Sequence, residues 1–326
     1  MGYQDVYQSW KNDPEGFWMQ AAQAIDWDQP PSKALFDKGG NLFEWFADAR
    51  VNTCWNAVDR HVEAGRGEQT AIIYDSPITH TKREISYVEL RNRVANLAGA
   101  LRAKGVEKGD RVIIYMPMIP EALEAMLACA RLGAVHSVVF GGFAANELAV
   151  RINDARPKAI IAASCGLEPG RVVHYKPLLD GAIDLAEHKP DFTVIFQREQ
   201  EVAKLIEGRD YNWHGFQYGV EPAECVPVEG NHPAYILYTS GTTGDPKGVE
   251  LTHYNVMSNV DQLTQTFSLH PDDSFLGVLP FFHSFGFSGT LVLPAVSGVG
   301  AVYHPNPLDA RSIGSLVDQH RVTFLL

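Results

Sequence analysis

Cysteine is scarce in this sequence, and its spacing matches no metal-binding pattern. The 326 residues include four cysteines, Cys54, Cys129, Cys165 and Cys225, which lie far apart and form no C-x-x-C pair. Such spacing predicts neither a zinc site nor a disulfide framework, because both usually draw on closely spaced cysteines. We therefore expect no protein-bound metal and a reduced, cytoplasmic protein.

Positive charge and long apolar runs are also in short supply. Lys and Arg number 27 against 39 Asp and Glu, which gives a net charge of -12. This balance argues against binding to nucleic acid or to an anionic membrane surface, since both would repel the chain. No stretch has the length of a membrane span without charges or prolines, and residues 1–18 lack the apolar centre of a signal peptide. Any anionic ligand must therefore meet local positive groups.

Apolar runs and helical stripes alternate along the chain from residue 70 onward. Strands are predicted at 71–74, 111–116, 135–140 and 159–162, with helices after Ser86, from Pro120 to Gly133 and over 144–154. This alternation predicts an α/β fold of parallel, helix-covered sheets. We expect an aromatic-rich cap over residues 1–69, a first α/β subdomain over 70–230 and the start of a second over 231–326.

The densest functional signal is the stretch from Tyr238 to Gly248, which follows the apolar run 234–237. It holds hydroxyls, glycines and one lysine, the groups that bind phosphate oxygens. The candidate phosphate-binding residues are Thr239, Ser240, Gly241, Thr242, Thr243, Gly244 and Lys247. A Walker A loop does not fit, because Pro246 stands where its second glycine belongs and Gly248 follows the lysine. An ordinary surface turn is the alternative.

This string resembles the nucleotide loop of the acyl-adenylate-forming ligases, the superfamily of acyl-CoA synthetases, luciferases and peptide-synthetase adenylation domains. The resemblance implies ATP with Mg²⁺, attack of a carboxylate on the α-phosphate, and a phosphate-holding catalytic role for Lys247. Residues 41–60 resemble the N-terminal extension of acetyl- and propionyl-CoA synthetases. Motifs that the family carries later, including the mobile C-terminal domain, have no counterpart here, so we expect the front half of an enzyme.

Two further motifs concern the acid and coenzyme A. His283, within Pro280 to Gly286, resembles a histidine that lines the family's acyl pocket, and a catalytic role is implied; a satisfied core histidine is the alternative. Gly142 and Arg171 match coenzyme A contacts, with Arg171 suited to a phosphate. At the position of Glu168 the acetate enzymes have an arginine, whereas a glutamate there resembles the propionate branch. Without the resemblance, the glycine pair at 141–142 would be only a turn.

The resemblance changes after the loop. Residues 1–248 are similar to propionyl- and acetyl-CoA synthetases, whereas residues 250–326 look like long-chain acyl ligases related to acyl-acyl-carrier-protein synthetases. We interpret the chain as a recombinant joined at the shared loop; a natural intermediate family is the alternative. The expected activity is ligation of a short acid, propionate and then acetate, to coenzyme A through acyl-AMP. Long-chain acid activation and a noncatalytic nucleotide-binding remnant are the alternatives.

Overall fold

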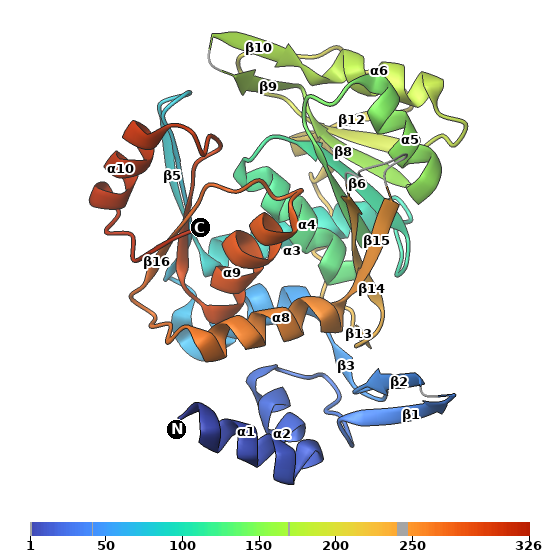
Figure 1. The fold of residues 1–326 in the computed structure, drawn as a ribbon. Helices are drawn as coiled ribbons and strands as arrows, with labels where there is room; N and C mark the ends of the chain where they lie inside the picture. Colours follow the sequence, from blue (N-terminus) through green and yellow to red (C-terminus); the bar gives the residue numbers. More distant parts are fainter. Residues whose placement is uncertain (1, 41, 169, 240–246) are drawn as a thin grey trace.

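The computed structural model describes residues 2–40, 42–168, 170–239 and 247–326, which build two β-sheets with helices between and around them (Figure 1). The larger sheet has seven strands, parallel except for the last pair. In spatial order they are β12 (Asp210–Asn212), β11 (Phe192–Phe196), β8 (Ala159–Ala163), β6 (Arg111–Met116), β7 (Val135–Phe140), β14 (Pro233–Thr239) and β15 (Lys247–Thr252).

The second sheet has five strands and is parallel except where β4 meets β5. Its spatial order is β18 (Phe324–Leu325), β16 (Ser274–Gly277), β17 (Gly300–Tyr303), β4 (Thr70–Ser76) and β5 (Thr81–Ser86). One continuous core of buried apolar side chains extends through both sheets. The predicted α/β class with parallel sheets is confirmed.

Helices α3 (Tyr87–Ala103) and α4 (Pro120–Leu132) lie between the two sheets (Figure 1). Helices α5 (Ala145–Ala155) and α6 (Tyr175–Leu185) pack together on the opposite face of the larger sheet. The chain order explains this division, because right-handed crossovers that run in opposite directions along a sheet place their helices on opposite faces. The remaining helices of the body are α7 (Trp213–Phe216), α8 (His253–Thr266), the π-helix η4 (Gly286–Val292), α9 (Leu293–Ser297) and α10 (Ala310–Gln319).

Helix boundaries follow the local signals in the sequence. The Ser86 hydroxyl accepts a hydrogen bond from the Glu89 backbone N–H at 3.3 Å, as expected for an N-cap. Pro120 occupies the first turn of α4, and Gly133 ends that helix in the left-handed conformation, with φ of 68°. The Thr252 hydroxyl caps α8. Among the described residues, no helix is both long and apolar enough to cross a membrane.

The N-terminal segment lies below the body in Figure 1 and is held by aromatic side chains. Trp18 packs edge to face on Trp45, and Phe46 packs the same way on Tyr254 of α8, with ring centroids 5.3 Å apart in each pair. Its elements are α1 (Tyr3–Asn12), α2 (Pro14–Ala21), the 3₁₀ turn η1 (Ala22–Ala24), β1 (Leu35–Gly39), β2 (Leu42–Trp45) and β3 (Arg50–Val51). Two π-helical segments, η2 (Trp55–Asp59) and η3 (Val62–Arg66), follow, and β3 pairs with β13 (Val228–Glu229).

Strands on each side of the boundary predicted at residue 230 join the sheet of the other side. Strand β14 lies beyond that boundary yet pairs with β7 of the larger sheet, whereas β4 and β5 lie before it and join β17 of the smaller sheet. Strand β15 was not predicted. The hairpin of β9 (Cys165–Glu168) and β10 (Arg171–His174) was not predicted either.

Candidate active site

The predicted phosphate loop connects two antiparallel strands at the edge of the larger sheet. Ala234 and Tyr235 at the start of β14 are buried beside β7, while the far end of the hairpin reaches solvent. The register sets Thr239 directly opposite Lys247, and both residues are exposed. The other predicted phosphate-binding residues, Ser240, Gly241, Thr242, Thr243 and Gly244, lie outside the described residues. The hairpin therefore brings a hydroxyl and an ammonium group to the two ends of the predicted loop.

A cavity of about 350 Å³, here called the loop cavity, opens beside this hairpin end. Both Thr239 and His283 line it, so the structure brings together two predicted sites that are far apart in the sequence. His283 is exposed rather than packed in the core, and its Nδ1 accepts a hydrogen bond from the Phe285 backbone N–H at 3.2 Å. The full lining comprises Val138, Val139, Phe140, Phe143, Arg151, Leu237, Tyr238, Thr239, Phe282, His283 and Ser284.

Arg151 is a lining residue that the sequence analysis missed. This buried side chain of α5 lies over the rings of Phe143 and Tyr238, with its guanidinium carbon 4.9 and 5.3 Å from their centroids. Its Nη1 is 3.1 Å from a carboxylate oxygen of Glu147, one helical turn earlier. The Tyr238 hydroxyl donates to Asp154 Oδ2 at 2.7 Å, and burial raises the pKa of Tyr238 well above its usual value. A buried cation, paired with Glu147, thus lines the loop cavity.

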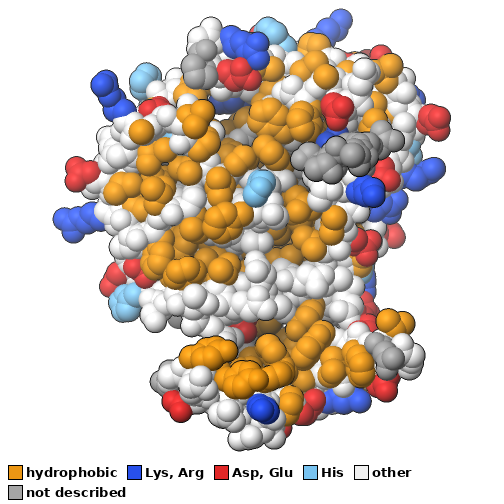
Figure 2. Space-filling view, viewed as in Figure 1, with side chains coloured by type: hydrophobic (Ala, Val, Ile, Leu, Met, Phe, Trp, Pro, Cys, Tyr) orange, Lys and Arg blue, Asp and Glu red, His pale blue; other side chains and the backbone are white. Residues whose placement is uncertain are grey.

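A second cavity of about 320 Å³, here called the apolar cavity, adjoins the first. Val138, Phe140 and Phe282 line both cavities, and the two phenylalanine rings pack edge to face 5.1 Å apart. The remaining lining is mostly apolar: Ile78, Met116, Pro117, Met118, Ala122, Gly141, Leu167, Glu168, Tyr175, Pro280, Phe281, Pro305 and Asn306. Figure 2 shows hydrophobic side chains gathered across the middle of this face of the body. Two adjoining chambers therefore form the candidate site: one holds Arg151, Thr239 and His283 beside the hairpin, and the other is mostly apolar.

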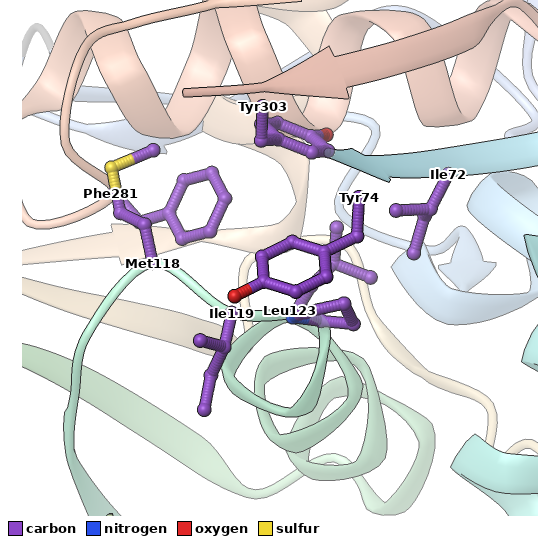
Figure 3. Close-up of a pocket in the computed structure, with 8 residues that line it drawn as sticks. Ile72, Tyr74, Met118, Ile119, Leu123, Phe281 and Tyr303 are labelled. Atoms are coloured by element: carbon purple, nitrogen blue, oxygen red, sulfur yellow. The ribbon is translucent and has the colours of Figure 1, made fainter. Parts of the chain in front are cut away.

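The pocket in Figure 3 is packing between the sheets rather than a third chamber. Tyr74, Phe281 and Tyr303 surround a space of about 10 Å³ above the start of α4. Phe281 and Tyr303 pack edge to face with centroids 5.3 Å apart. A space of this size holds at most about one water molecule. It supports the apolar cavity, because Met118 and Phe281 line both spaces.

The glycine pair after β7 is held by two buried tyrosines. The Tyr175 hydroxyl donates to the Gly141 carbonyl at 2.6 Å, and a Cβ on Gly141 would lie 2.3 Å from the Tyr175 ring. The Gly142 backbone N–H donates to the Tyr115 hydroxyl at 3.2 Å, and burial raises the pKa of Tyr115 to about 12. Gly142 has φ of 119°, which favours glycine. This turn is thus built for close approach of backbone and rings.

Arg171 is placed differently from a free phosphate ligand. Its side chain is 68% exposed on β10, and its Nε lies 2.8 Å from Glu168 Oε2, directly across the hairpin. Glu168 and Gly141 line the apolar cavity, whereas Gly142 and Arg171 themselves do not. The Glu168 carboxylate therefore pairs with the one predicted cation at this end of the site.

Comparisons with known proteins place this geometry in a family. The AMP-binding enzyme family matches residues 58–326, and the acetyl-coenzyme A synthetase N-terminus family matches residues 3–57. The chain therefore belongs to the AMP-binding enzymes, and the predicted resemblance to adenylate-forming ligases is confirmed. The match runs through Glu250 without interruption, so both sides of the apparent break belong to this family. Separate origins for the sequences before and after Glu250 stay a prediction, which sequencing the source DNA across the Glu250 codon would test.

Individual relatives agree with this assignment. The chain is 52% identical over 238 residues to acyl-CoA synthetase short-chain family member 3, mitochondrial, of Rattus norvegicus, covering 73% of this chain and 35% of the relative. It is 40% identical to the acetyl-coenzyme A synthetase of Xanthobacter autotrophicus, covering 98% of this chain and 50% of the relative. An acetoacetyl-CoA synthetase structure from Streptomyces lividans superposes with a TM-score of 0.87 at 23% identity, covering all of this chain and 50% of that one. The chain thus spans half the length, or less, of these relatives.

Proposed function

We propose that this chain is the nucleotide- and acid-binding part of an ATP-dependent short-chain acid–CoA ligase. A carboxylate oxygen of the acid attacks the α-phosphorus of ATP, supplied as its magnesium complex, and pyrophosphate leaves. The thiol sulfur of coenzyme A then attacks the acyl carbon of the acyl-AMP, and AMP leaves. The observation that carries this proposal is the pair of adjoining chambers, which offers phosphate ligands at one end and an apolar space at the other.

The predicted residues that the structure describes have roles in this scheme. Lys247 and Thr239, opposed across the hairpin, hold the phosphates, where cation and hydroxyl donors favour departure of pyrophosphate. His283 lines the loop cavity next to Phe282, and from there it contacts the acid or its adenylate. Coenzyme A approaches from the side of Gly142 and Arg171. A cytoplasmic location belongs to the proposal and rests on four cysteines that are all free thiols.

The wall between the chambers favours a short acid. Phe140 and Phe282 stand between them with centroids 5.1 Å apart, so an acid held at the loop cavity meets two rings. Propionate is the first choice because Glu168 follows the propionate pattern, and acetate is the second. A long acyl chain would need at least one of the rings to turn aside.

ATP–pyrophosphate exchange by the purified chain tests the proposal. Propionate, acetate, a medium-chain acid and a long-chain acid are offered in turn, and we expect exchange to be fastest with propionate. The variant Phe282→Ala should extend exchange toward longer acids, because it removes one of the two rings between the chambers. Faster exchange with the long acid by the wild type would assign specificity to the segment after Glu250. ATP binding without exchange, by folded protein, would support the noncatalytic nucleotide-binding alternative.

A further inference from the structure

Two cysteines from distant parts of the chain meet beneath the N-terminal segment. Strand β3 pairs antiparallel with β13, so that Val51 lies opposite Val228. Cys54 follows Val51 by three residues and Cys225 precedes Val228 by three, so the antiparallel direction carries both toward each other. The Asn52 side chain reinforces the approach, because its Nδ2 donates to the Val226 carbonyl at 2.8 Å. The β3–β13 pairing thus brings together two thiols that the sequence spacing gave no reason to connect.

The two thiols share a charged partner. Each sulfur lies within 4.8 Å of the other and of Asp59, with Cys225 Sγ 3.6 Å and Cys54 Sγ 4.0 Å from Asp59 Oδ2. Arg131, only 3% exposed, donates to both Asp59 oxygens at 2.7 and 3.0 Å and approaches Cys54 Sγ at 3.6 Å. All four groups therefore form one contact cluster inside the protein.

A metal ion fits this cluster poorly. Arg131 already occupies both oxygens of Asp59, which removes the carboxylate as a free ligand. The same guanidinium lies 3.6 Å from Cys54 Sγ, where its charge would repel a divalent cation bound to that sulfur. Two sulfurs alone fall short of the four ligands of a structural zinc site. The arrangement suits a pair of thiols better than a metal centre.

One of the two thiols is accessible. Cys225 is half-buried and lines a cavity of about 250 Å³ together with Asn52, Trp55 and Glu224, whereas Cys54 is fully buried behind it. A reagent in the cavity can therefore reach Cys225 first, and Cys54 can react only through Cys225. Exposed attacking and buried resolving thiols form the usual order in thiol–disulfide exchange.

We propose that Cys54 and Cys225 are a redox-modification site that takes a small disulfide, of the glutathione disulfide class, as its oxidant. The Cys225 thiolate attacks one sulfur of the oxidant, the S–S bond breaks, and one glutathione thiolate leaves. The Cys54 thiolate then attacks the Cys225 sulfur of this mixed disulfide, and the second glutathione thiolate leaves. The two protons lost by the protein thiols pass to solvent or to the two glutathiones. The two cysteines are oxidised and one glutathione disulfide is reduced.

The product would tie the N-terminal segment to the connection that leads into β14. It would close a loop from residue 54 to residue 225, which restricts the unfolded chain and raises the temperature of unfolding. A hydrogen bond to Cys54, together with burial, raises the pKa of the Cys225 thiol. The first step needs the thiolate, so its rate should increase as pH rises above neutrality.

The test incubates the native chain with glutathione disulfide, blocks remaining thiols with iodoacetamide after acid quench and unfolding, and maps the peptides by mass spectrometry. We expect a Cys54–Cys225 peptide pair in most molecules, with Cys129 and Cys165 recovered as alkylated thiols. The yield should rise with pH, and the product should melt several degrees higher than the reduced chain.

Single variants separate the two steps and control for folding. Cys54→Ala should accumulate the mixed disulfide at Cys225, and Cys225→Ser should form neither product. Cys165→Ala, which removes another fully buried thiol, should still form the Cys54–Cys225 pair. The wild-type peptide map decides the question even where a variant fails to fold.

Three results would overturn the proposal. The first is that Cys54 and Cys225 stay reduced in folded wild-type protein while the oxidant reacts with small thiols in the same tube. The second is that disulfides form only between molecules. The third is stoichiometric Zn²⁺ binding that Cys54→Ala abolishes, because the cluster would then be a metal site.

Discussion

Mild acid should destabilise this chain, because buried histidines, among them His61, His136 and His253, remain uncharged in the folded state. His61 and His253 are fully buried and His136 is 3% exposed. Burial lowers the pKa of His61 from 6.5 to about 4 and the pKa of both His136 and His253 to about 3. The unfolded chain takes up protons at these residues below pH 6.5, and the folded chain does not until near pH 4.

The unfolded state therefore binds more protons across this window, and stability falls as the pH falls. Each of these histidines costs about 1.3 kcal/mol of unfolding free energy between about pH 7 and about pH 5.5, so the three together cost about 4 kcal/mol. Glu124, whose pKa burial raises to about 7, takes up a proton in the folded state over the same range and offsets part of this loss. That sum is a large part of the stability of an ordinary domain. The loss should be nearly absent above pH 7, where the imidazoles are neutral in both states.

Urea titrations at the two pH values measure this loss directly. His136→Leu should reduce the loss between the two pH values by about 1.3 kcal/mol, whatever it does to stability at pH 7. His214→Gln, at an exposed position, is the matched control and should leave the dependence unchanged. The reasoning fails if stability is the same at both pH values, or if His136→Leu loses as much on acidification as the wild type.

Two substitutions test buried packing, one at the Asp59–Arg131 ion pair and one at the glycine turn beside the apolar cavity. Asp59→Ala leaves buried Arg131 without its carboxylate and should cost about 3–5 kcal/mol of unfolding free energy, seen in denaturant titrations; a loss below about 1 kcal/mol would contradict the ion pair. Gly141→Ala sets a Cβ 2.3 Å from the Tyr175 ring and should cost about 1–3 kcal/mol in the same assay, whereas Gly215→Ala meets nothing within 4 Å and should be close to neutral. Equal effects of the two alanine substitutions would refute the close approach.

Local signals in the sequence predicted local structure well. The cap at Ser86, the first-turn proline Pro120 and the left-handed Gly133 each act through neighbouring backbone, so the sequence around them suffices. The alternation of apolar runs and helical stripes likewise predicted the α/β class, because a parallel sheet needs helices on its faces.

Pairing between distant segments could not be predicted in this way. Strand β15 carries alternating Val249 and Leu251, but Gly248 and the loop before it hid that pattern, and only the partner β14 shows that it is a strand. Which sheet a strand near residue 230 joins depends on which strand edges meet in space. Hydrophobic periodicity does not encode that choice.

The site shows the same division. The predicted residues Thr239 and His283 line one cavity, although their roles in binding phosphate and acid stay predictions. Arg151 was missed because its spacing from Glu147 is also that of an ordinary helix-surface ion pair. The Glu168–Arg171 ion pair depends on a hairpin that was not predicted.

The most direct test of the account is equilibrium binding of ATP to the folded chain by isothermal titration, with and without magnesium. We expect binding by the wild type and an affinity 10- to 100-fold lower for Lys247→Ala, since hydrogen bonds to charged groups contribute about 1.5–3 kcal/mol. Lys204→Ala, which removes an exposed lysine of the connection between β11 and β12, should bind like the wild type. Equal affinity of Lys247→Ala and the wild type, or no binding by a chain shown to be folded, would contradict the assignment of the hairpin as the nucleotide site.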